Sequence, residues 1–261
     1  MDTRPIGFFD SGLGGLSVLK STLALLPRED YIYFGDNLNA PYGDKSIQEI
    51  TRLTLEGADL LISHGVKAIV LACNTATGSC INQIRERLSL PVISVEPAIK
   101  PACESPEEGQ VLMLATAATV RLPRYRALVS RMPDPARVIS IPCPGLVDRI
   151  EQGLFNPSDY EDVLERHLKQ YHGLAVSGIV LGCTHYPFIG DIIQAYAQRH
   201  FSGSCTLYDG SEGTARQLER VLIKKGLDNG NGSGKVTFLT SGDRDRCLPL
   251  YETFMKKQLI L

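Results

Sequence analysis

The sequence contains one short pattern twice, as IVLACNT at residues 69–75 and as IVLGCTH at residues 179–185. The copies align without a gap, and each is typical of a buried strand followed by a small residue, a cysteine and polar side chains. The repeat predicts two similar α/β halves related by a pseudo-twofold axis. Ligands of open parallel sheets bind beyond the carboxyl ends of the strands. We therefore expect Cys73 and Cys183 to face one active site in the cleft between the halves.

Short apolar segments alternate with amphipathic segments along the whole chain, which predicts an α/β fold with mostly parallel sheets. We expect a helix to open at each capping-box pattern, Ser46–Glu49 and Ser158–Glu161, and another to begin directly after each of the two cysteines. The predicted strands cover residues 6–9, 31–34, 68–72, 92–95, 111–115, 138–141, 178–182, 206–208 and 236–239.

The repeat also predicts how the chain divides into domains. A first domain of residues 1–97 and 208–261 carries Cys73, and a second domain of residues 98–207 carries Cys183. The segment EPAIKP at residues 96–101 marks the first boundary. Residues 206–209 mark the return into the first domain.

The composition excludes several classes of protein. With 27 basic and 29 acidic residues in 261, the net charge is −2, so no basic field is present to hold a nucleic acid. No apolar run is long enough to span a bilayer, and the N-terminus does not resemble a signal peptide, so we expect a cytoplasmic protein without a membrane partner. The seven cysteines form no CxxC or zinc-finger spacing. They therefore predict free thiols and no metal site.

Two thiols that face one cleft from opposite sides suit proton transfer at a single carbon. One thiolate removes a proton from one face, and the other thiol delivers a proton to the opposite face, so the carbon inverts. A free thiol titrates near 8.5 and needs help to ionise at neutral pH. A helix N-terminus or a proton acceptor can supply that help. The candidate acceptors are Asp10, Glu151 and His185.

The segment DSGLGG at residues 10–15 is a glycine-rich turn between a strand and a helix. It matches neither GxGxxG nor GxxxxGK[ST], so it is a weak nucleotide signal. Its backbone N–H groups and the Ser11 hydroxyl suit a carboxylate, with Asp10 facing an ammonium group or a thiol proton. The turn at Pro41–Gly43 could supply further backbone donors.

Two other functions remain open from these residues. Cys183 could be the nucleophile of a hydrolase with His185 as its base, although this leaves Cys73 without a role. The chain could also bind an amino acid or nucleotide without catalysis, or regulate a partner through protein contacts.

Eight segments in order along nearly the whole chain resemble bacterial glutamate racemases of the aspartate/glutamate racemase family. The pair ACNTA and LGCTHYP is specific for this group, and DSGLGG with PYG distinguishes the glutamate enzymes from aspartate and hydantoin racemases. The segments are DSGLGG (10–15), YFGD (33–36), PYG (41–43), ACNTA (72–76), EPA (96–98), LAT (114–116), CP (143–144) and LGCTHYP (181–187).

The resemblance implies a cofactor-independent isomerase that interconverts L- and D-glutamate by two-base transfer at Cα. It implies that D-glutamate is supplied for peptidoglycan synthesis, hence for cell-wall biogenesis and cell shape, and that the enzyme is a homodimer. It implies that Cys73 is the base toward D-glutamate, assisted by Asp10. Cys183 would be the base toward L-glutamate, assisted by His185 and Glu151.

The resemblance also implies which residues hold the substrate. Thr116 and Thr119 would contact the side-chain carboxylate of glutamate. The complete implied set is Asp10, Ser11, Tyr42, Gly43, Asn74, Thr75, Thr116, Thr119, Thr184 and His185.

Overall fold

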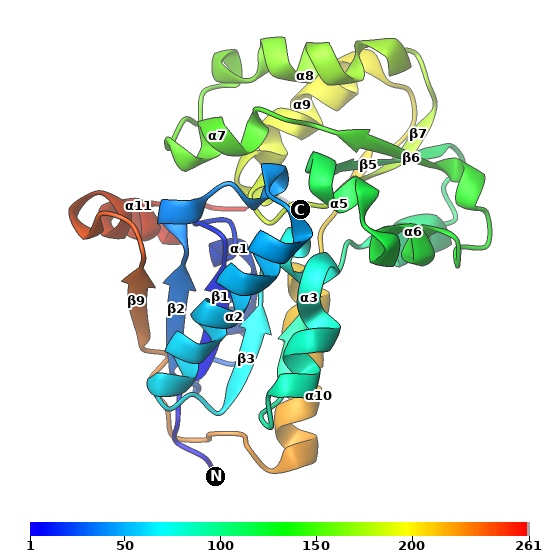
Figure 1. Ribbon diagram of the computed structural model, residues 1–261. Coiled ribbons are helices and arrows are strands. Elements are labelled where there is room, and N and C mark those ends of the chain that lie inside the picture. The colour runs from blue at the N-terminus through cyan, green and yellow to red at the C-terminus, as the bar shows by residue number, and fades with distance from the viewer. Residues whose placement is uncertain (260–261) are drawn as a thin grey trace.

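The computed structural model describes residues 1–259, which form two parallel β-sheets covered by helices (Figure 1). The strand order is β4-β3-β1-β2-β9 in the first sheet and β6-β5-β7-β8 in the second. All predicted strand positions are confirmed, and the strands pair in parallel. The strands are β1 (Ile6–Asp10), β2 (Tyr31–Gly35), β3 (Ala68–Leu71), β4 (Val92–Ser94), β5 (Gln110–Ala115), β6 (Val138–Pro142), β7 (Val176–Leu181), β8 (Thr206–Tyr208) and β9 (Val236–Thr240).

Helices connect these strands and cover both sheets. Within residues 1–259, no helix combines the length and the apolar character needed to cross a membrane. The α-helices are α1 (Leu16–Leu25), α2 (Ile47–Ser63), α3 (Asn74–Arg87), α4 (Ile99–Glu104), α5 (Ala117–Arg121), α6 (Pro123–Val129), α7 (Leu146–Glu151), α8 (Glu161–Leu168), α9 (Gly190–His200), α10 (Ser211–Lys225) and α11 (Arg244–Lys256).

The central strands explain why their sequences are continuously apolar. Every residue of β1, β3 and β7 is buried, because helices cover both faces of each sheet. The carboxyl ends of β2, β3 and β9 point toward the part of the chain built on the second sheet (Figure 1). The fold therefore brings side chains at these strand ends toward the second sheet.

The two capping-box predictions have different outcomes. Ser46 caps α2 as predicted, and its hydroxyl accepts the Glu49 N–H at 3.2 Å. The prediction at Ser158 is wrong, because this residue lies inside a short 3₁₀ turn and α8 begins only at Glu161. The capping box is made by Asn156 and Asp159 instead, since a proline directly after Asn156 starts the turn two residues earlier than predicted.

The helix predictions at the two cysteines also differ in outcome. Cys73 is the N-cap of α3, as predicted. The prediction for Cys183 is wrong, because the 3₁₀ helix η6 (Tyr186–Ile189) follows it and α9 begins only at Gly190. Pro187 lies in the first turn of η6 and has no N–H for an α-helical hydrogen bond. Cys183 therefore lacks the direct helix N-terminus that Cys73 has.

The last part of the chain returns to the first sheet. After β8, α10 packs against α1 and β4, and α11 packs against α1 and β9. β8 belongs to the second sheet and ends at Tyr208. The division into residues 1–97 with 208–261 and residues 98–207 stays a prediction.

Candidate active site

The two cysteines line one small cavity between the carboxyl ends of β3 and β7. Its volume is about 20 Å³, which is room for a single water molecule. Two larger hollows, of about 1180 and 600 Å³, are lined by neither Cys73 nor Cys183. The cavity is lined by Ser11, Pro41, Tyr42, Gly43, Cys73, Asn74, Thr75, Thr116, Val147, Cys183, Thr184 and His185.

Cys73 has neutral hydrogen-bonding partners. Its Sγ lies 3.4 Å from the Ser11 hydroxyl and accepts the Ala76 N–H at 3.4 Å, within the first turn of α3. Burial raises the pKa of the Cys73 thiol to about 12, and the charge of Asp10 adds to this increase, while the bonds from Ser11 and Ala76 oppose it. Cys73 is therefore held as a protonated thiol at neutral pH.

Cys183 instead lies beside an imidazole that contacts a carboxylate. Its Sγ is 3.6 Å from Nδ1 of His185, and Nε2 of His185 is 2.6 Å from Oε1 of Glu151. Burial lowers the pKa of His185, but Cys183 and Glu151 outweigh it and hold the pKa well above its usual value. A nucleophile, a base and an orienting carboxylate in series form a unit suited to proton transfer.

The Glu151 carboxylate belongs to α7 but is held by the turns that follow β1 and β2. Its Oε1 accepts the Leu13 N–H at 2.9 Å, and its Oε2 accepts from Nδ2 of Asn37 at 3.3 Å. A Cβ added to Gly12 would lie 2.1 Å from Oε1, so only glycine leaves room for the carboxylate. Glu151 therefore joins the two halves of the molecule at the active site.

Asn37 was not among the predicted site residues. Its Oδ1 accepts from the hydroxyls of Thr240, at 3.0 Å, and Tyr251, and these bonds direct its amide toward Glu151. In the sequence, Asn37 follows YFGD and is typical of a turn residue. No sequence signal reveals its contact with a carboxylate 114 residues away.

Asp10 ends β1, is completely buried and does not line the cavity. Its carboxylate accepts the Gly12 N–H at 3.0 Å and the Thr184 hydroxyl at 3.4 Å, and so contacts both halves. Burial raises the pKa of Asp10, against the opposing effect of His185. No hydrogen bond joins Asp10 to Cys73 in residues 1–259, so its effect on this thiol is electrostatic.

Three threonine hydroxyls meet beside the cavity. Oγ1 of Thr75 lies 3.1 Å from that of Thr116 and 3.2 Å from that of Thr119, and the latter two are 3.0 Å apart. Thr75 follows β3, whereas Thr116 and Thr119 follow β5, so both sheets contribute. Thr119 does not line the small cavity but lines the adjacent hollow of about 600 Å³. The cluster offers several hydroxyl donors to an anion.

The remaining predicted substrate contacts differ in what they can offer. Asn74 has its Oδ1 buried without a hydrogen-bond partner in the described part of the chain, so it can accept from an ammonium group. The Tyr42 hydroxyl donates to Asp36 at 2.6 Å, which directs it away from the cavity. Tyr42 and Gly43 therefore offer main-chain groups to a ligand, whereas Ser11 and Thr184 offer hydroxyls.

The chain is similar to known proteins over most of its length. The family model of Asp/Glu/Hydantoin racemase matches residues 12–218. The chain is 45% identical to the glutamate racemase of Clostridium perfringens over 230 residues, 88% of this chain and 87% of that protein. It is 40% identical to the glutamate racemase of Clostridium botulinum over 259 residues, 98% of this chain and 99% of that one.

A solved structure shows the same fold at full length. The glutamate racemase of Francisella tularensis, in complex with D-glutamate, matches with a TM-score of 0.84 at 31% identity, covering 100% of this chain and 96% of that one. The chain therefore belongs to the Asp/Glu/Hydantoin racemase family, and within it to the glutamate racemases.

Proposed function

We propose that this glutamate racemase inverts Cα with two cysteine bases and no cofactor. The observation that carries the proposal is that Cys73 and Cys183, from the ends of two different sheets, line one cavity. A single base reaches only one face of a tetrahedral carbon. Two thiols on either side of the substrate serve both faces.

In the L-to-D direction, the Cys183 thiolate takes the Cα proton of L-glutamate and becomes a thiol. The electron pair of the broken C–H bond remains on Cα and delocalises into the adjacent carboxylate. The Cys73 thiol then donates its proton to the opposite face, which yields D-glutamate and leaves Cys73 as a thiolate. The raised pKa values of Cys73 and His185 support this starting state, since Cys73 keeps its proton and an imidazolium at His185 is favoured beside Cys183.

The polar residues around the cavity supply the substrate contacts. Oδ1 of Asn74 accepts from the substrate ammonium group, because this oxygen is buried without another partner in residues 1–259. The hydroxyls of Thr75, Thr116 and Thr119 bind the side-chain carboxylate. Ser11, Thr184 and the main chain of Tyr42 and Gly43 complete the site.

The small cavity requires the protein to open before glutamate binds. Its 20 Å³ cannot hold an amino acid, so the two sheets must separate at their carboxyl ends. Separation would withdraw Glu151 from Leu13 and Asn37, which lie in the part of the chain built on the first sheet. Closure over the substrate therefore restores the contacts of Glu151 with Leu13 and Asn37 only once glutamate is inside.

The resemblance to the bacterial enzymes carries the biological part of the proposal. The protein acts in the cytoplasm as a homodimer and supplies D-glutamate for peptidoglycan synthesis, and thus for cell-wall biogenesis and cell shape. It works without a metal, a nucleic acid or a membrane partner. The domains are residues 1–97 with 208–261 and residues 98–207.

Turnover in D₂O tests the mechanism. Solvent deuterium should enter Cα as the opposite enantiomer forms, because the arriving proton comes from a thiol that exchanges with water. Inverted product that keeps its original proton would exclude the two-base mechanism. A stable acyl group on Cys183 would support the hydrolase hypothesis instead. Glutamate binding without any change in optical rotation would support a silent binder.

A further inference from the structure

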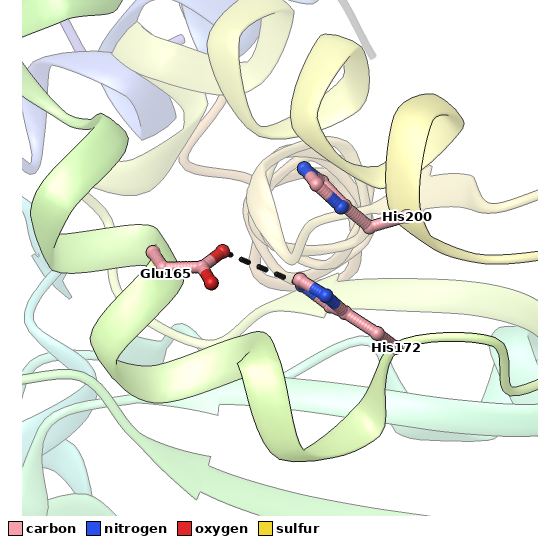
Figure 2. Close-up of side chains that lie close together, drawn as sticks. All are labelled: Glu165, His172 and His200. Atoms are coloured by element: carbon pink, nitrogen blue, oxygen red, sulfur yellow. Dashed lines mark ion pairs between the residues drawn. The ribbon is translucent and has the colours of Figure 1, made fainter.

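A second cluster of reactive side chains lies in the part of the chain built on the second sheet. Glu165 on α8, His172 directly after the 3₁₀ turn η5 (Lys169–Tyr171), and His200 at the end of α9 point toward one another (Figure 2). One ligand atom from each lies within 4.8 Å of the others. All three side chains are half-buried, and none lines the cavity that holds the two thiols.

The His200 side chain takes no part in the hydrogen bonds that join the rest of the cluster. Tyr196 connects the other two residues, because its hydroxyl donates to Oε2 of Glu165 at 2.7 Å and lies 2.9 Å from Nε2 of His172. The His200 ring stacks on His172 with centroids 4.1 Å apart and planes at 14°. Neither ring nitrogen of His200 has a hydrogen-bond partner in residues 1–259. Two imidazoles so close also repel each other when both are protonated.

We propose that Glu165, His172 and His200 form a binding site for a Zn²⁺-like divalent transition metal. Imidazole and carboxylate are ordinary zinc ligands, whereas Ca²⁺ and Mg²⁺ prefer oxygen alone. A tetrahedral ion with bonds of about 2.0–2.1 Å separates its ligand atoms by roughly 3.4 Å. Nε2 of His172 and Oε2 of Glu165 are already 3.6 Å apart. Water completes the coordination, because the cluster reaches the surface.

Binding requires two local rearrangements. Nε2 of His172 must exchange its contact with the Tyr196 hydroxyl, 2.9 Å away, for the ion. Stacked rings direct their lone pairs along parallel planes, so the His200 ring must rotate about its χ2 bond to aim at the same ion as His172. His200 is the last residue of α9, and its rotation would give up ring contacts with His172 and Tyr196, whose centroids lie 4.1 and 4.4 Å away.

The bound ion would connect three separate pieces of the chain. It would join the last turn of α8, the turn before β7 and the end of α9. Because the ion binds the folded state, a hundredfold excess over its dissociation constant should raise the Tm by about 5 °C. Racemisation should continue in a strong chelator, since none of the three ligands touches the thiol cavity.

Titration calorimetry with Zn²⁺ on the metal-free full chain tests the proposal. We expect one Zn²⁺ per chain, and at least tenfold weaker binding in each of His172→Asn, His200→Asn and Glu165→Gln. The glutamine variant retains the shape of the side chain and an acceptor for Tyr196, so its effect is not explained by loss of folding. The matched control is His64→Asn, which changes an exposed histidine elsewhere and should bind normally.

The cysteines could bind Zn²⁺ by themselves, so the double variant Cys73→Ala/Cys183→Ala is titrated as well. It should retain the site. Loss of Zn²⁺ binding in this variant would overturn the proposal. So would binding that survives both histidine substitutions, or no binding by the unchanged protein at millimolar Zn²⁺.

Discussion

Cys73 and Cys183 occupy equivalent strand ends but have different surroundings. Cys73 caps α3, contacts a hydroxyl and a backbone amide, and has its pKa raised to about 12. Cys183 has no α-helix directly after it and contacts His185, which in turn contacts Glu151. The repeat in the sequence therefore gives the two sulfur atoms equivalent positions, but the groups that control the protonation of each thiol differ.

Thermodynamics limits which kinetic quantities can reveal the difference between the two thiols. The enantiomers of glutamate have equal free energy, so kcat/KM must be the same in both directions in every variant. Differences between the two thiols can appear only in kcat and KM taken separately, or in hydrogen exchange without inversion. The comparison is therefore tested with these quantities.

The largest effect is expected from removing either thiol. Cys73→Ala and Cys183→Ala should each lose about 10⁴-fold in racemisation, at the upper end of what a positioned acid or base contributes. The remaining thiol should still exchange the Cα proton of one enantiomer. In D₂O, Cys183→Ala should therefore deuterate D-glutamate only, and Cys73→Ala should deuterate L-glutamate only, as read by proton NMR.

Cys103→Ala is the control for these variants, because its half-buried thiol on α4 does not line the cavity. It should racemise at the normal rate. Equal deuteration of both enantiomers by either single variant would show that the two thiols do not serve separate faces.

Glu151→Gln should come next, with a loss of about 10–100-fold in kcat, the value of a hydrogen bond to a charged group. The substitution retains the shape but removes the charge that raises the pKa of His185. The pKa of His185 should fall, so its imidazolium form should be lost at a lower pH as the pH rises. NMR titration of the ring measures this. An unchanged pKa of His185 in this variant would show that Glu151 does not act on Cys183 through His185.

Gly12→Ala should produce a similar loss although it does not replace a titratable residue. The added methyl would lie 2.1 Å from Oε1 of Glu151 and must displace the carboxylate from Leu13 and His185. Both kcat and the pKa of His185 should change as in Glu151→Gln. Gly213→Ala is the matched control, since a Cβ there meets nothing within 4 Å. Normal activity in Gly12→Ala would mean that Glu151 acts from another position.

The two thiols also illustrate which features could be predicted from the sequence and which could not. Strand positions were predictable because buried parallel strands are continuously apolar, and the repeat placed both cysteines at strand ends. The start of α9 and the capping box before α8 were missed because local patterns compete with prolines nearby. Asn37 was missed because its role depends on a contact between distant segments, which one sequence does not encode as a pattern.

The smallest effect is expected from Asn37→Ala, which removes the amide that holds Oε2 of Glu151. The loss in kcat should be about 2–10-fold, because one hydrogen bond of modest geometry is removed while the Leu13 N–H remains. Thr240→Val is the comparison variant: it removes one of the two hydroxyls that direct the Asn37 amide but leaves that of Tyr251, so it should lower kcat less than Asn37→Ala does.

A double-mutant cycle decides whether Asn37 acts through Glu151. In a Glu151→Gln background, Asn37→Ala should not lower kcat further, because the carboxylate that Asn37 positions is already absent. If the two losses multiply instead, or if Thr240→Val lowers kcat as much as Asn37→Ala, then Asn37 supports the local fold rather than the proton acceptor. In that case the Glu151 carboxylate would be held from the first-sheet side by the Leu13 N–H.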